Sequence, residues 1–412
     1  MNEQVLISDI FRQEFAKMVA VISKSFGLQH IELAEDIVSE TFLTATENWK
    51  EKGTPAQPIA WLYAVARQKI LYHFRRKKIL DEKIMPAIKS EQDQSYEENI
   101  DFSTENIRDS RLQMMFAVCD PAIASEAQIA LALRILCGFG IDEIAEAFLT
   151  NKEAVNKRLF RAKKKLRTEK MRLEMPSEKE MNKRLDTVLH IIYLLFNEGY
   201  YSATQNQILR KELCLEALQL GLLLAEYDKT NLPKTNALIA LMCFHTSRFD
   251  ARQNDAGHFI LYEQQDEALW NKELIAQGKY FLQAAASGSD ISSYHLEAGI
   301  AFLHCVKEET EEKWQHILQH YDLLLQINYS PVVALNRLYA LYKVKGKVTA
   351  LKEAEQLQLT NNHFYFTLLG ELYSGMDNNK AKECFKTAIS LARTATEKQS
   401  IGEKLGALEF CV

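Results

Sequence analysis

The sequence lacks the cysteine pattern of a disulfide-stabilised or zinc-binding protein. Its seven cysteines are isolated from one another, and no CxxC pair occurs. An odd number of scattered cysteines does not indicate a disulfide framework, and zinc-finger spacing is missing. Packing is the favoured interpretation, over metal binding, for the small group His304, Cys305, His316 and His320. We predict no metal site and expect most cysteines to be small buried apolar residues.

The chain also lacks the features of membrane proteins and of common enzyme classes. No apolar run approaches the roughly 20 residues that a membrane helix needs. The N-terminal residues carry acidic side chains early, where a signal peptide has cations and then an apolar centre. There is no glycine-rich phosphate loop, no HExxH and no nucleophile elbow. We predict a cytoplasmic protein that does not enter a membrane, is not an enzyme and needs no cofactor.

Charge is distributed unevenly along the 412 residues, a length that predicts two or three domains. The net charge is −5, yet residues 1–172 hold 26 Lys+Arg against 25 Asp+Glu. Within that part, residues 81–109 carry 9 acidic residues against 3 basic ones. The pattern therefore indicates two basic modules joined by an acidic linker and followed by an acidic C-terminal half.

The most basic stretch of the first module is Trp61–Lys78, WLYAVARQKILYHFRRKK. Its apolar residues recur at helical spacing. Its C-terminal half is rich in cations, with aromatic residues between them and no acidic residue. Such a helix suits a nucleic-acid strand. The alternative is a helix whose cations complement its own dipole, and this stretch alone does not decide between the two.

Two helices and a loop are predicted before that stretch, and a linker after it. Residues 5–26 and 31–49 have amphipathic patterns, residues 50–58 read as a loop, and the polar, acidic residues 80–109 read as a flexible linker. Pro58 fits the first turn of the basic helix. The second helix is expected to bury Ala34, Ile37, Val38, Thr41, Ala45 and Trp49, and to expose Glu35, Asp36, Ser39, Glu40 and Glu47.

Residues 125–167 have the pattern of a helix-turn-helix. One helix is expected from 125 to about 138, a short one over 141–148 and a longer one over 152–167 after a tight turn. Because residues 152–172 hold 10 Lys+Arg against 2 Glu, phosphate contact is the expected use; a solvated basic helix is the alternative. The face expected to pack on Ile144 and Ala145 is Val155, Leu159, Ala162 and Leu166, and the outward face is Glu153, Asn156, Lys157, Phe160, Arg161 and Lys164.

From Met181 onward the sequence is helical throughout, with almost no β-like alternation. Residues 331–343 and 348–356, and then 364–373 and 380–391, pair as helical hairpins. Tetratricopeptide-like spacing is seen in the last pair at Gly370, Tyr373, Ala381, Phe385 and Ala388. We expect an all-α protein whose C-terminal part is solenoid-like and offers a concave surface to other proteins; a scaffold without a partner is the alternative.

Together these elements resemble the bacterial sigma factors of the extracytoplasmic-function group of the sigma-70 superfamily. Residues 34–49 (AEDIVSETFLTATENW), residues 61–76 and the helix-turn-helix occur in the order found in that group. The C-terminal part resembles the subgroup with a long tetratricopeptide-like extension, in LLFNEGYYS (194–202), SRFD (247–250), QDEALW (265–270) and SPVVALNR (330–337). The resemblance covers nearly the whole chain.

The resemblance implies an alternative sigma factor that directs core RNA polymerase to promoters. The acidic helix would dock on the clamp of the largest polymerase subunit, and the loop 50–58 would capture a base flipped from the minus-ten element. Polymerase contacts are expected from Glu35, Asp36, Ser39 and Glu40. The melted minus-ten strand would be held by Trp61, Arg67, Gln68, Lys69, Tyr72, Arg75, Arg76 and Lys77. The minus-thirty-five element would be read through base edges by Lys152, Asn156 and Lys157, and through phosphates by Arg158, Arg161, Lys163 and Lys164.

One departure from the family affects promoter specificity. The family's basic helix commonly has Arg-Asn followed four residues later by Asp, where this chain has Arg67-Gln68 and then Tyr72. The change of Asn to Gln keeps an amide, but Tyr72 removes a carboxylate. The promoter sequence preferred by other members is therefore not carried over.

The predicted domains are a region 2-like module (1–80), an acidic linker (81–110), a region 4-like module (111–172) and a regulatory tetratricopeptide-like domain (173–412) that contacts a protein regulator. A second hypothesis is a helix-turn-helix regulator with a tetratricopeptide-like sensor, which leaves the first 80 residues unused. A third is a protein scaffold. Co-purification with core polymerase separates the first two hypotheses, and a steep salt dependence of DNA binding excludes the third.

Overall fold

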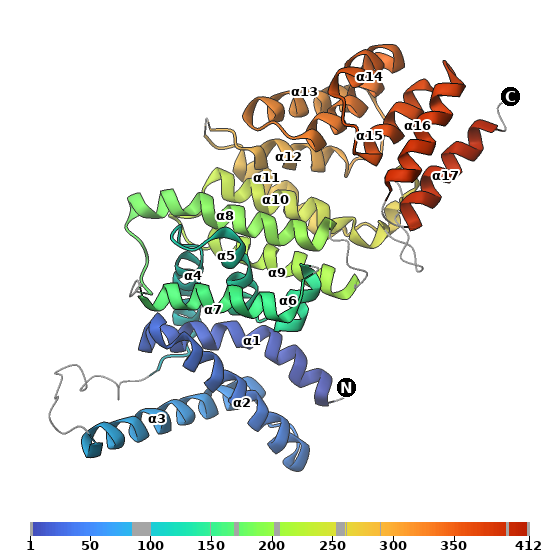
Figure 1. Ribbon diagram of the computed structural model, residues 1–412. Helices are drawn as coiled ribbons and strands as arrows, with labels where there is room; N and C mark the ends of the chain where they lie inside the picture. The colour runs from blue at the N-terminus through green and yellow to red at the C-terminus, as the bar shows by residue number, and fades with distance from the viewer. Residues whose placement is uncertain are drawn as a thin grey trace. The chain divides into compact units, whose positions relative to one another are not determined.

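The computed structural model describes residues 3–84, 100–148, 150–168, 173–201, 207–252, 260, 262–288, 290–392 and 395–409. These residues form α-helices with short 3-10 turns and one π-helical turn, and no strand occurs among them (Figure 1). The all-α prediction is confirmed. The chain divides into two compact units, Met1–Thr230 and Asn231–Val412. None of the helices within the described residues is long and apolar enough to cross a membrane.

Unit 1 begins with three helices, α1 (Glu3–Phe26), α2 (Ile31–Lys52) and α3 (Pro58–Ile84). A positive φ of 86° at Gly27 ends α1, and Gly53, with φ 81°, ends α2 by donating its N–H to the Trp49 carbonyl at 2.8 Å. Glycine adopts this conformation without steric cost, which explains both ends. All six residues predicted for the apolar face of α2 are buried. The loop is shorter than predicted, because α2 continues to Lys52.

The next helix, α4 (Thr104–Val118), begins inside the stretch predicted to be a flexible linker. The Ser103 side chain accepts the Asn106 N–H and starts the helix. Its apolar residues, among them Leu112 and Met115, are buried, and Lys24 of α1 donates to the Asn106 side chain at 2.8 Å. The prediction was wrong for Thr104–Asp109 because the first turns of α4 are polar and resemble a linker. Residues 85–99 of the predicted linker lie outside the described part of the chain.

The helix-turn-helix is formed by α5 (Ser125–Leu131), the π-helical turn η3 (Ala132–Leu136), α6 (Ile141–Ala147) and α7 (Lys152–Thr168). The Cys137 N–H donates to the Ala132 carbonyl at 3.1 Å, and Gly138, with φ 74°, then reverses the chain. At the start of α6, the Glu143 carboxylate accepts the Gly140 N–H at 2.7 Å. The predicted helices are therefore confirmed, whereas the π-helical turn was not predicted.

Unit 1 ends with the hairpin of α8 (Glu178–Tyr201) and α9 (Gln207–Ala225). Both helices pack against the second module, with α8 on α4 and α5 and α9 on α4 and α6. Arg184 of α8 pairs with Asp120, which follows α4, at 2.9 Å. The first hairpin of the predicted C-terminal domain thus packs with the predicted DNA-binding modules.

Unit 2 is a succession of helices, each of which packs against the next in the chain. Its first helix, α10 (Pro233–Ser247), is apolar on nearly all sides and is buried over most of its length. The 3-10 turns of Phe249–Ala251, Tyr262–Gln264 and Glu267–Leu269 connect it to the later helices. These are α11 (Lys272–Ala285), α12 (Ser293–Leu303), α13 (Glu311–Ile327), α14 (Pro331–Leu357), α15 (His363–Tyr373), α16 (Asn378–Leu391) and α17 (Ala395–Glu409).

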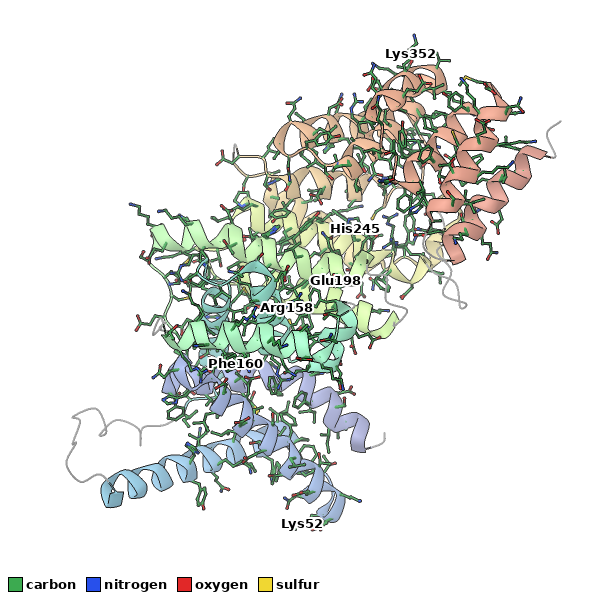
Figure 2. All side chains as sticks on the ribbon, in the orientation of Figure 1. Lys52, Arg158, Phe160, Glu198, His245 and Lys352 are labelled. Carbon is green, nitrogen blue, oxygen red and sulfur yellow. The ribbon has the colours of Figure 1, made fainter. Side chains whose placement is uncertain are left out.

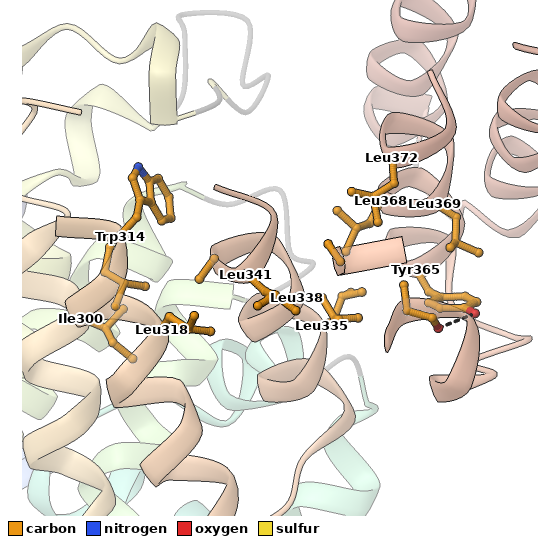
Figure 3. Close-up of a cluster of buried hydrophobic side chains, with 14 residues drawn as sticks. Ile300, Trp314, Leu318, Leu335, Leu338, Leu341, Tyr365, Leu368, Leu369 and Leu372 are labelled. Carbon is orange, nitrogen blue, oxygen red and sulfur yellow. Dashed lines mark hydrogen bonds between the residues drawn. The ribbon is translucent and has the colours of Figure 1, made fainter. Parts of the chain in front are cut away.

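One apolar cluster joins α12 to α15 within unit 2 (Figure 3). It contains Trp314 of α13, and Tyr365 of α15, whose hydroxyl donates to the Ala354 carbonyl at 3.0 Å. The path of α14 changes at Gly346, where φ is 77°, so the predicted pair 331–343 and 348–356 is present as the two halves of one kinked element. The tetratricopeptide-like hairpin of α15 and α16 is also present, with Gly370 against Phe385.

Candidate nucleic-acid and polymerase interfaces

Helix α7 presents one apolar face to the protein and one basic face to solvent. Asn151 accepts the Ala154 N–H at 2.8 Å and begins the helix. The four residues predicted to pack inward are at most 4% exposed, and Ile144 and Ala145 of α6 are buried with them. Figure 2 labels Arg158 and Phe160 on this helix. The residues predicted to face outward are exposed, and these are Glu153, Asn156, Lys157, Phe160, Arg161 and Lys164; Lys152, a predicted base contact, is exposed as well.

Three of the α7 cations predicted to contact DNA hold local acidic partners. The pairs are Lys152 with Asp142 at 2.6 Å, Lys157 with Glu153 at 2.6 Å and Arg158 with Glu126 at 3.2 Å. Exposed ion pairs of this kind contribute about 0–1 kcal/mol, because water screens both charges. A DNA phosphate can replace these carboxylates at little cost, so the pairs do not remove the basic face.

Helix α3 packs its apolar residues inward and leaves a polar side exposed. Leu62, Ala66 and Ile70 are at most 1% exposed, while Trp61 is half-buried with its ring edge-on to Trp49, 5.6 Å between centroids. The two residues that depart from the family pattern, Gln68 and Tyr72, are both exposed. Three further residues predicted to hold the strand have side chains outside the described part, and these are Arg75, Arg76 and Lys77.

Two of the cations predicted to hold the DNA strand are engaged within unit 1. The Arg67 guanidinium donates to the Ile100 carbonyl at 2.7 Å. The Lys69 ammonium lies 3.5 Å from the Glu40 carboxylate on α2. Lys69, which was predicted to bind DNA, is thus paired with Glu40, which was predicted to bind polymerase.

Tyr63 of α3 has a structural role that sequence reasoning missed. Its hydroxyl donates to the Glu14 carboxylate of α1 at 2.5 Å, and its ring stacks on Phe102 with 4.6 Å between centroids. Burial, followed by the Glu14 carboxylate, raises the pKa of Tyr63. This tyrosine ties α3 to α1 and to the chain entering α4. Tyr63 lies in the basic stretch among aromatic residues that resemble rings stacking on a nucleic-acid strand. The sequence therefore held no signal that distinguishes the structural role of Tyr63 from the role expected of its aromatic neighbours.

Glu35 was predicted to be exposed on α2 and is instead 4% exposed. One carboxylate oxygen accepts the Nε–H of Arg134 at 2.8 Å, and the other accepts the Lys163 ammonium at 2.5 Å. Both cations come from the helix-turn-helix, and they cover the carboxylate from solvent. The prediction of an exposed Glu35 was therefore wrong. The other predicted polymerase contacts are exposed, and these are Asp36, Ser39 and Glu40.

The acidic side of α2 carries several carboxylates close together. Burial and then the neighbouring Glu35 raise the pKa of Asp36, while Lys163 opposes the rise. One turn away, Glu32 accepts Arg167 of α7 at 3.1 Å. A concentration of like charge attracts cations strongly. In this structure those cations are supplied by the protein itself.

Two arginines of unit 1 with acidic partners far away in the sequence were missed, Arg12 and Arg134. Arg12 of α1 pairs with Glu143 of α6 and with Glu212 of α9. Arg134 of the π-helical turn also lies over the Phe15 ring, 4.9 Å from its centroid. Arg134 is a lone cation within an apolar stretch, which is a signal that could have identified it as a paired residue, whereas Arg12 has polar and charged neighbours and carries no such signal.

A separate groove of about 900 Å³ opens in unit 2. Among the described residues, its lining includes the aromatic residues Trp314 and Tyr339, three lysines and a single acidic residue, Glu371. The Lys343 ammonium lies 5.4 Å from the Trp314 ring and 5.5 Å from the Tyr339 ring. Lys347 donates to the Ser374 carbonyl at 2.7 Å. Lys404 pairs with Glu371, so the lining has a net positive charge.

His304 also lines this groove, but it adds no charge. Burial, followed by Arg248 and Lys313, lowers the pKa of His304 to about 3, so its imidazole is neutral at physiological pH. The ring meets Trp314 edge-on, 6.0 Å between centroids. Among the described residues, no group of three or more His, Cys, Asp or Glu is placed to hold a metal ion. The groove's positive charge therefore comes from its lysines.

Comparison with known families gives three matches along the chain. Residues 12–79 match the family described as Sigma-70 region 2, and residues 124–166 match Sigma-70, region 4. Residues 184–286 match a family of unknown function, DUF6596. The chain is also 33% identical over 384 residues to an uncharacterized protein of Rhizobium meliloti (strain 1021), which covers 92% of this chain and 90% of that protein.

The two sigma regions, on α1 to α3 and on the helix-turn-helix, define a transcription initiation factor. The chain belongs to the sigma-70 family and is an alternative sigma factor with a fused C-terminal domain. Its sigma regions bind core RNA polymerase and promoter DNA. The helix-turn-helix regulator hypothesis is not favoured, because region 2 accounts for the N-terminal residues that it left unused. Sigma factor families are not enzymes.

Proposed function

We propose that this sigma factor acts in the cytoplasm, without catalysis of its own, through three surfaces of unit 1. The acidic side of α2 docks on the polymerase clamp, α3 holds the melted minus-ten strand, and α7 reads the minus-thirty-five element. The observation that carries the proposal is the division of α7, whose four apolar residues are buried while Asn156 and Lys157 point outward. A helix so divided can enter a major groove without disturbing its own core.

Reconstituted transcription with core polymerase and a promoter library tests the role of α7. We expect Lys157→Ala to lower transcription and relax base preference, because a base contact contributes about 1–3 kcal/mol, or about 5- to 150-fold. The matched control is Lys183→Ala, an exposed lysine of α8. If both variants transcribe the same promoters at the same rate as the parent, the assignment of α7 is wrong.

Co-purification with core polymerase tests the role of α2. Asp36→Lys reverses an exposed charge on the predicted docking side, and we expect it to slow association and lower recovery about tenfold, since complementary charge mainly sets orientation and on-rate. Glu47→Lys is the control, because it makes the same change elsewhere on α2 and was not assigned to docking. Equal recovery of both variants would contradict the docking role.

The C-terminal domain is proposed to bind a protein regulator in the groove of unit 2. Its cations and rings fit an extended acidic peptide, because lysines attract carboxylates and Trp314 and Tyr339 offer apolar area. A 12-residue fluorescent peptide of glutamate, leucine and glycine should bind, and the same peptide with lysine for glutamate should not. Lys343→Glu should abolish binding, and Lys352→Glu, on the same helix but outside the groove lining (Figure 2), should not. Binding that ignores peptide charge would overturn this proposal.

A further inference from the structure

Two of the C-terminal segments that resemble the family meet inside unit 2, SRFD (247–250) and QDEALW (265–270). The guanidinium carbon of Arg248, from the first segment, lies 6.0 Å from the ring centroid of Trp270, from the second. The same carbon lies 5.5 Å from the ring centroid of Tyr262. A charged side chain and two aromatic rings are thus brought together by parts of the chain that have no role in the sigma regions.

Arg248 is a buried cation without an anion. Its side chain belongs to a residue that is 6% exposed, and no acidic side chain of the described residues pairs with it. The Nε of Arg248 and the indole N–H of Trp270 are both buried without a hydrogen-bond partner. Arginine is almost never buried unpaired, because the lost hydration is not recovered. The two rings lie near the outer limit of about 6 Å for attraction between a cation and an aromatic ring, so they compensate the charge only in part.

A neighbouring buried cation, Lys313, has a full set of partners. It is 5% exposed, and its ammonium donates to the Tyr262 hydroxyl at 3.0 Å and to the Val306 carbonyl at 2.7 Å. The Glu309 carboxylate accepts the same ammonium at 2.9 Å and the Trp314 N–H at 2.7 Å. The fold therefore supplies an anion to one buried cation beside Tyr262 and supplies none to the other.

The groove of unit 2 reaches the neighbourhood of Arg248. Tyr262 and His304 belong to the groove lining, and their rings meet edge-on with 5.0 Å between centroids. The guanidinium is thus 5.5 Å from a ring of that lining. Sites for small molecules are concave and mostly apolar, with a few polar groups that fix the orientation of the ligand. This end of the groove has that composition.

From these observations we propose that Arg248 is the anion-binding group of a small-ligand site at the Tyr262 end of the groove. The guanidinium fork matches two oxygens of a carboxylate or of a phosphate, and the Trp270 N–H supplies a further donor. The rings of Tyr262 and His304 offer apolar contact to a planar ligand. The ligand class is a small aromatic carboxylate or phosphate ester. The site does not depend on the lysines proposed to hold an acidic peptide.

Replacement of Arg248 by methionine tests whether the charge serves the fold or a ligand. Methionine keeps a long unbranched side chain and removes the charge. In buffer free of carboxylates and phosphate, Arg248→Met should raise the unfolding temperature of the full chain by about 2–4 °C, because a buried unpaired charge is removed. A lower unfolding temperature, or failure to fold, would show that the fold needs this charge and would overturn the inference.

Arg337→Met is the matched control for that measurement, because Arg337 is a half-buried arginine of unit 2 that does have anions. Its guanidinium pairs with Asp322 and Glu353. Removal of this cation leaves two carboxylates without their partner, so the unfolding temperature should fall. Opposite signs for the two arginines are the expected result.

Calorimetric titration of the full chain with sodium benzoate and with phenyl phosphate measures binding itself. Arg248→Met should weaken binding about 10- to 150-fold, the range for hydrogen bonds to charged groups. Arg248→Lys keeps the charge but loses the fork, so its affinity should lie between those of the parent and of Arg248→Met. Benzamide, the uncharged analogue, should not bind. No binding of either anion, or equal binding to parent and Arg248→Met, would overturn the inference.

The same titrations identify the ligand group and separate this site from the proposed peptide groove. Tighter binding of benzoate indicates a carboxylate, and tighter binding of phenyl phosphate indicates a phosphate ester. Lys343→Glu should lose the acidic peptide and keep most of its affinity for the small anion. If Lys343→Glu loses the small anion and Arg248→Met keeps it, the anion is held by the groove lysines and the inference is wrong.

Discussion

Ion pairs join α2 to the helix-turn-helix in unit 1, whereas close apolar contact joins consecutive helices in unit 2. At the first interface Glu35 is shared between Arg134 and Lys163. At the second, glycine is needed for the helices to approach, since a Cβ at Gly370 would lie 2.7 Å from the ring of Phe385. A charged side chain in an ion pair can exchange one partner for another. The close contact between Gly370 and Phe385 has no such alternative partner.

This difference predicts that the α2 interface of unit 1 is easier to open than the contacts between the helices of unit 2. Buried ion pairs nearly balance attraction against desolvation, so a competing set of charges can open them. Apolar contacts at close-packed density are lost as soon as the surfaces separate. We therefore expect competing charges to open the α2 interface more readily than the hairpins of unit 2.

The largest effect is expected when the apolar interface is broken at Phe385. This ring is 2% exposed, and Phe385→Ala should destabilise unit 2 by about 3–5 kcal/mol, through lost burial and the cavity left behind. Denaturant unfolding of the full chain measures the change. Phe364→Ala removes the same side chain from a site that is 58% exposed and should cost much less. Similar losses for both variants would contradict the role given to close packing.

A smaller effect is expected from adding one methyl group between α10 and α11. A Cβ at Gly278 would lie 2.5 Å from the Phe244 ring, so Gly278→Ala should cost about 1–3 kcal/mol as the buried ring is displaced. At Gly402 of α17 nothing lies within 4 Å of the added atom. Gly402→Ala should instead stabilise by about 0.5–1 kcal/mol, since alanine is the better helix former. Thermal unfolding measures both variants, and the unfolding temperature should fall for Gly278→Ala and rise for Gly402→Ala.

Next in size is a pH effect at Glu216 of α9, inside unit 1. Burial, opposed by Arg111 and Arg12 and aided by Glu212, raises the pKa of Glu216 to about 7. The folded state then binds more protons than the unfolded state between the ordinary carboxyl pKa and about 7, so stability falls as the pH rises through that window. Glu216→Gln should remove this loss and stabilise by about 2 kcal/mol above pH 7, with little change below pH 4.

Unfolding of the parent and of Glu216→Gln from pH 4 to pH 8 measures this effect. Glu226→Gln, at an exposed position just after α9, controls for the loss of one negative charge. A pH dependence that is the same in all three proteins would show that the surroundings of Glu216 do not raise its pKa.

The smallest effect is expected at the exposed ion pair of Lys69 and Glu40. At 3.5 Å, with Glu40 63% exposed, their coupling in a double-mutant cycle should be about 0.2–1 kcal/mol and should vanish in high salt. Arg134 and Glu35, which are far less exposed, should show larger coupling that salt weakens less. Equal coupling in the two cycles would remove the distinction between the largely buried pair and an ordinary surface pair.

The local part of the structure could be predicted from the sequence because helical periodicity is a local signal. The inward and outward faces of α7 follow from its spacing of apolar residues, and so does the buried face of α2. The tetratricopeptide-like hairpin was also predictable, since Gly370 and Phe385 are close in sequence. The kink of α14 was not predicted, because 331–343 and 348–356 were expected to form a hairpin, but the interruption between them at Gly346 lies where the two segments were separated.

The contacts of the candidate site could not be predicted, because their partners are distant in the chain. Glu35 is 99 residues from Arg134 and 128 from Lys163, and no spacing rule links charges across such a separation. A charged residue on an amphipathic helix is expected to face water unless a partner is known. The polar start of α4 was misread for a related reason, since Ser103 caps a helix whose burial depends on α1.

The π-helical turn at Ala132–Leu136 makes the direction of the Arg134 side chain depend on the number of residues in this part of the chain. A π-helical turn contains one residue more than the α-helical path requires, and here that turn carries Arg134. Deleting one residue from the turn would restore the α-helical hydrogen-bond pattern and change the direction of the side chains within it by about 100°, the angle between successive residues of an α-helix. Arg134 would then point away from Glu35 while α6 and α7 kept their own sequences. A change in chain length, with no change of charge, would thus remove the ion pair between Arg134 and Glu35.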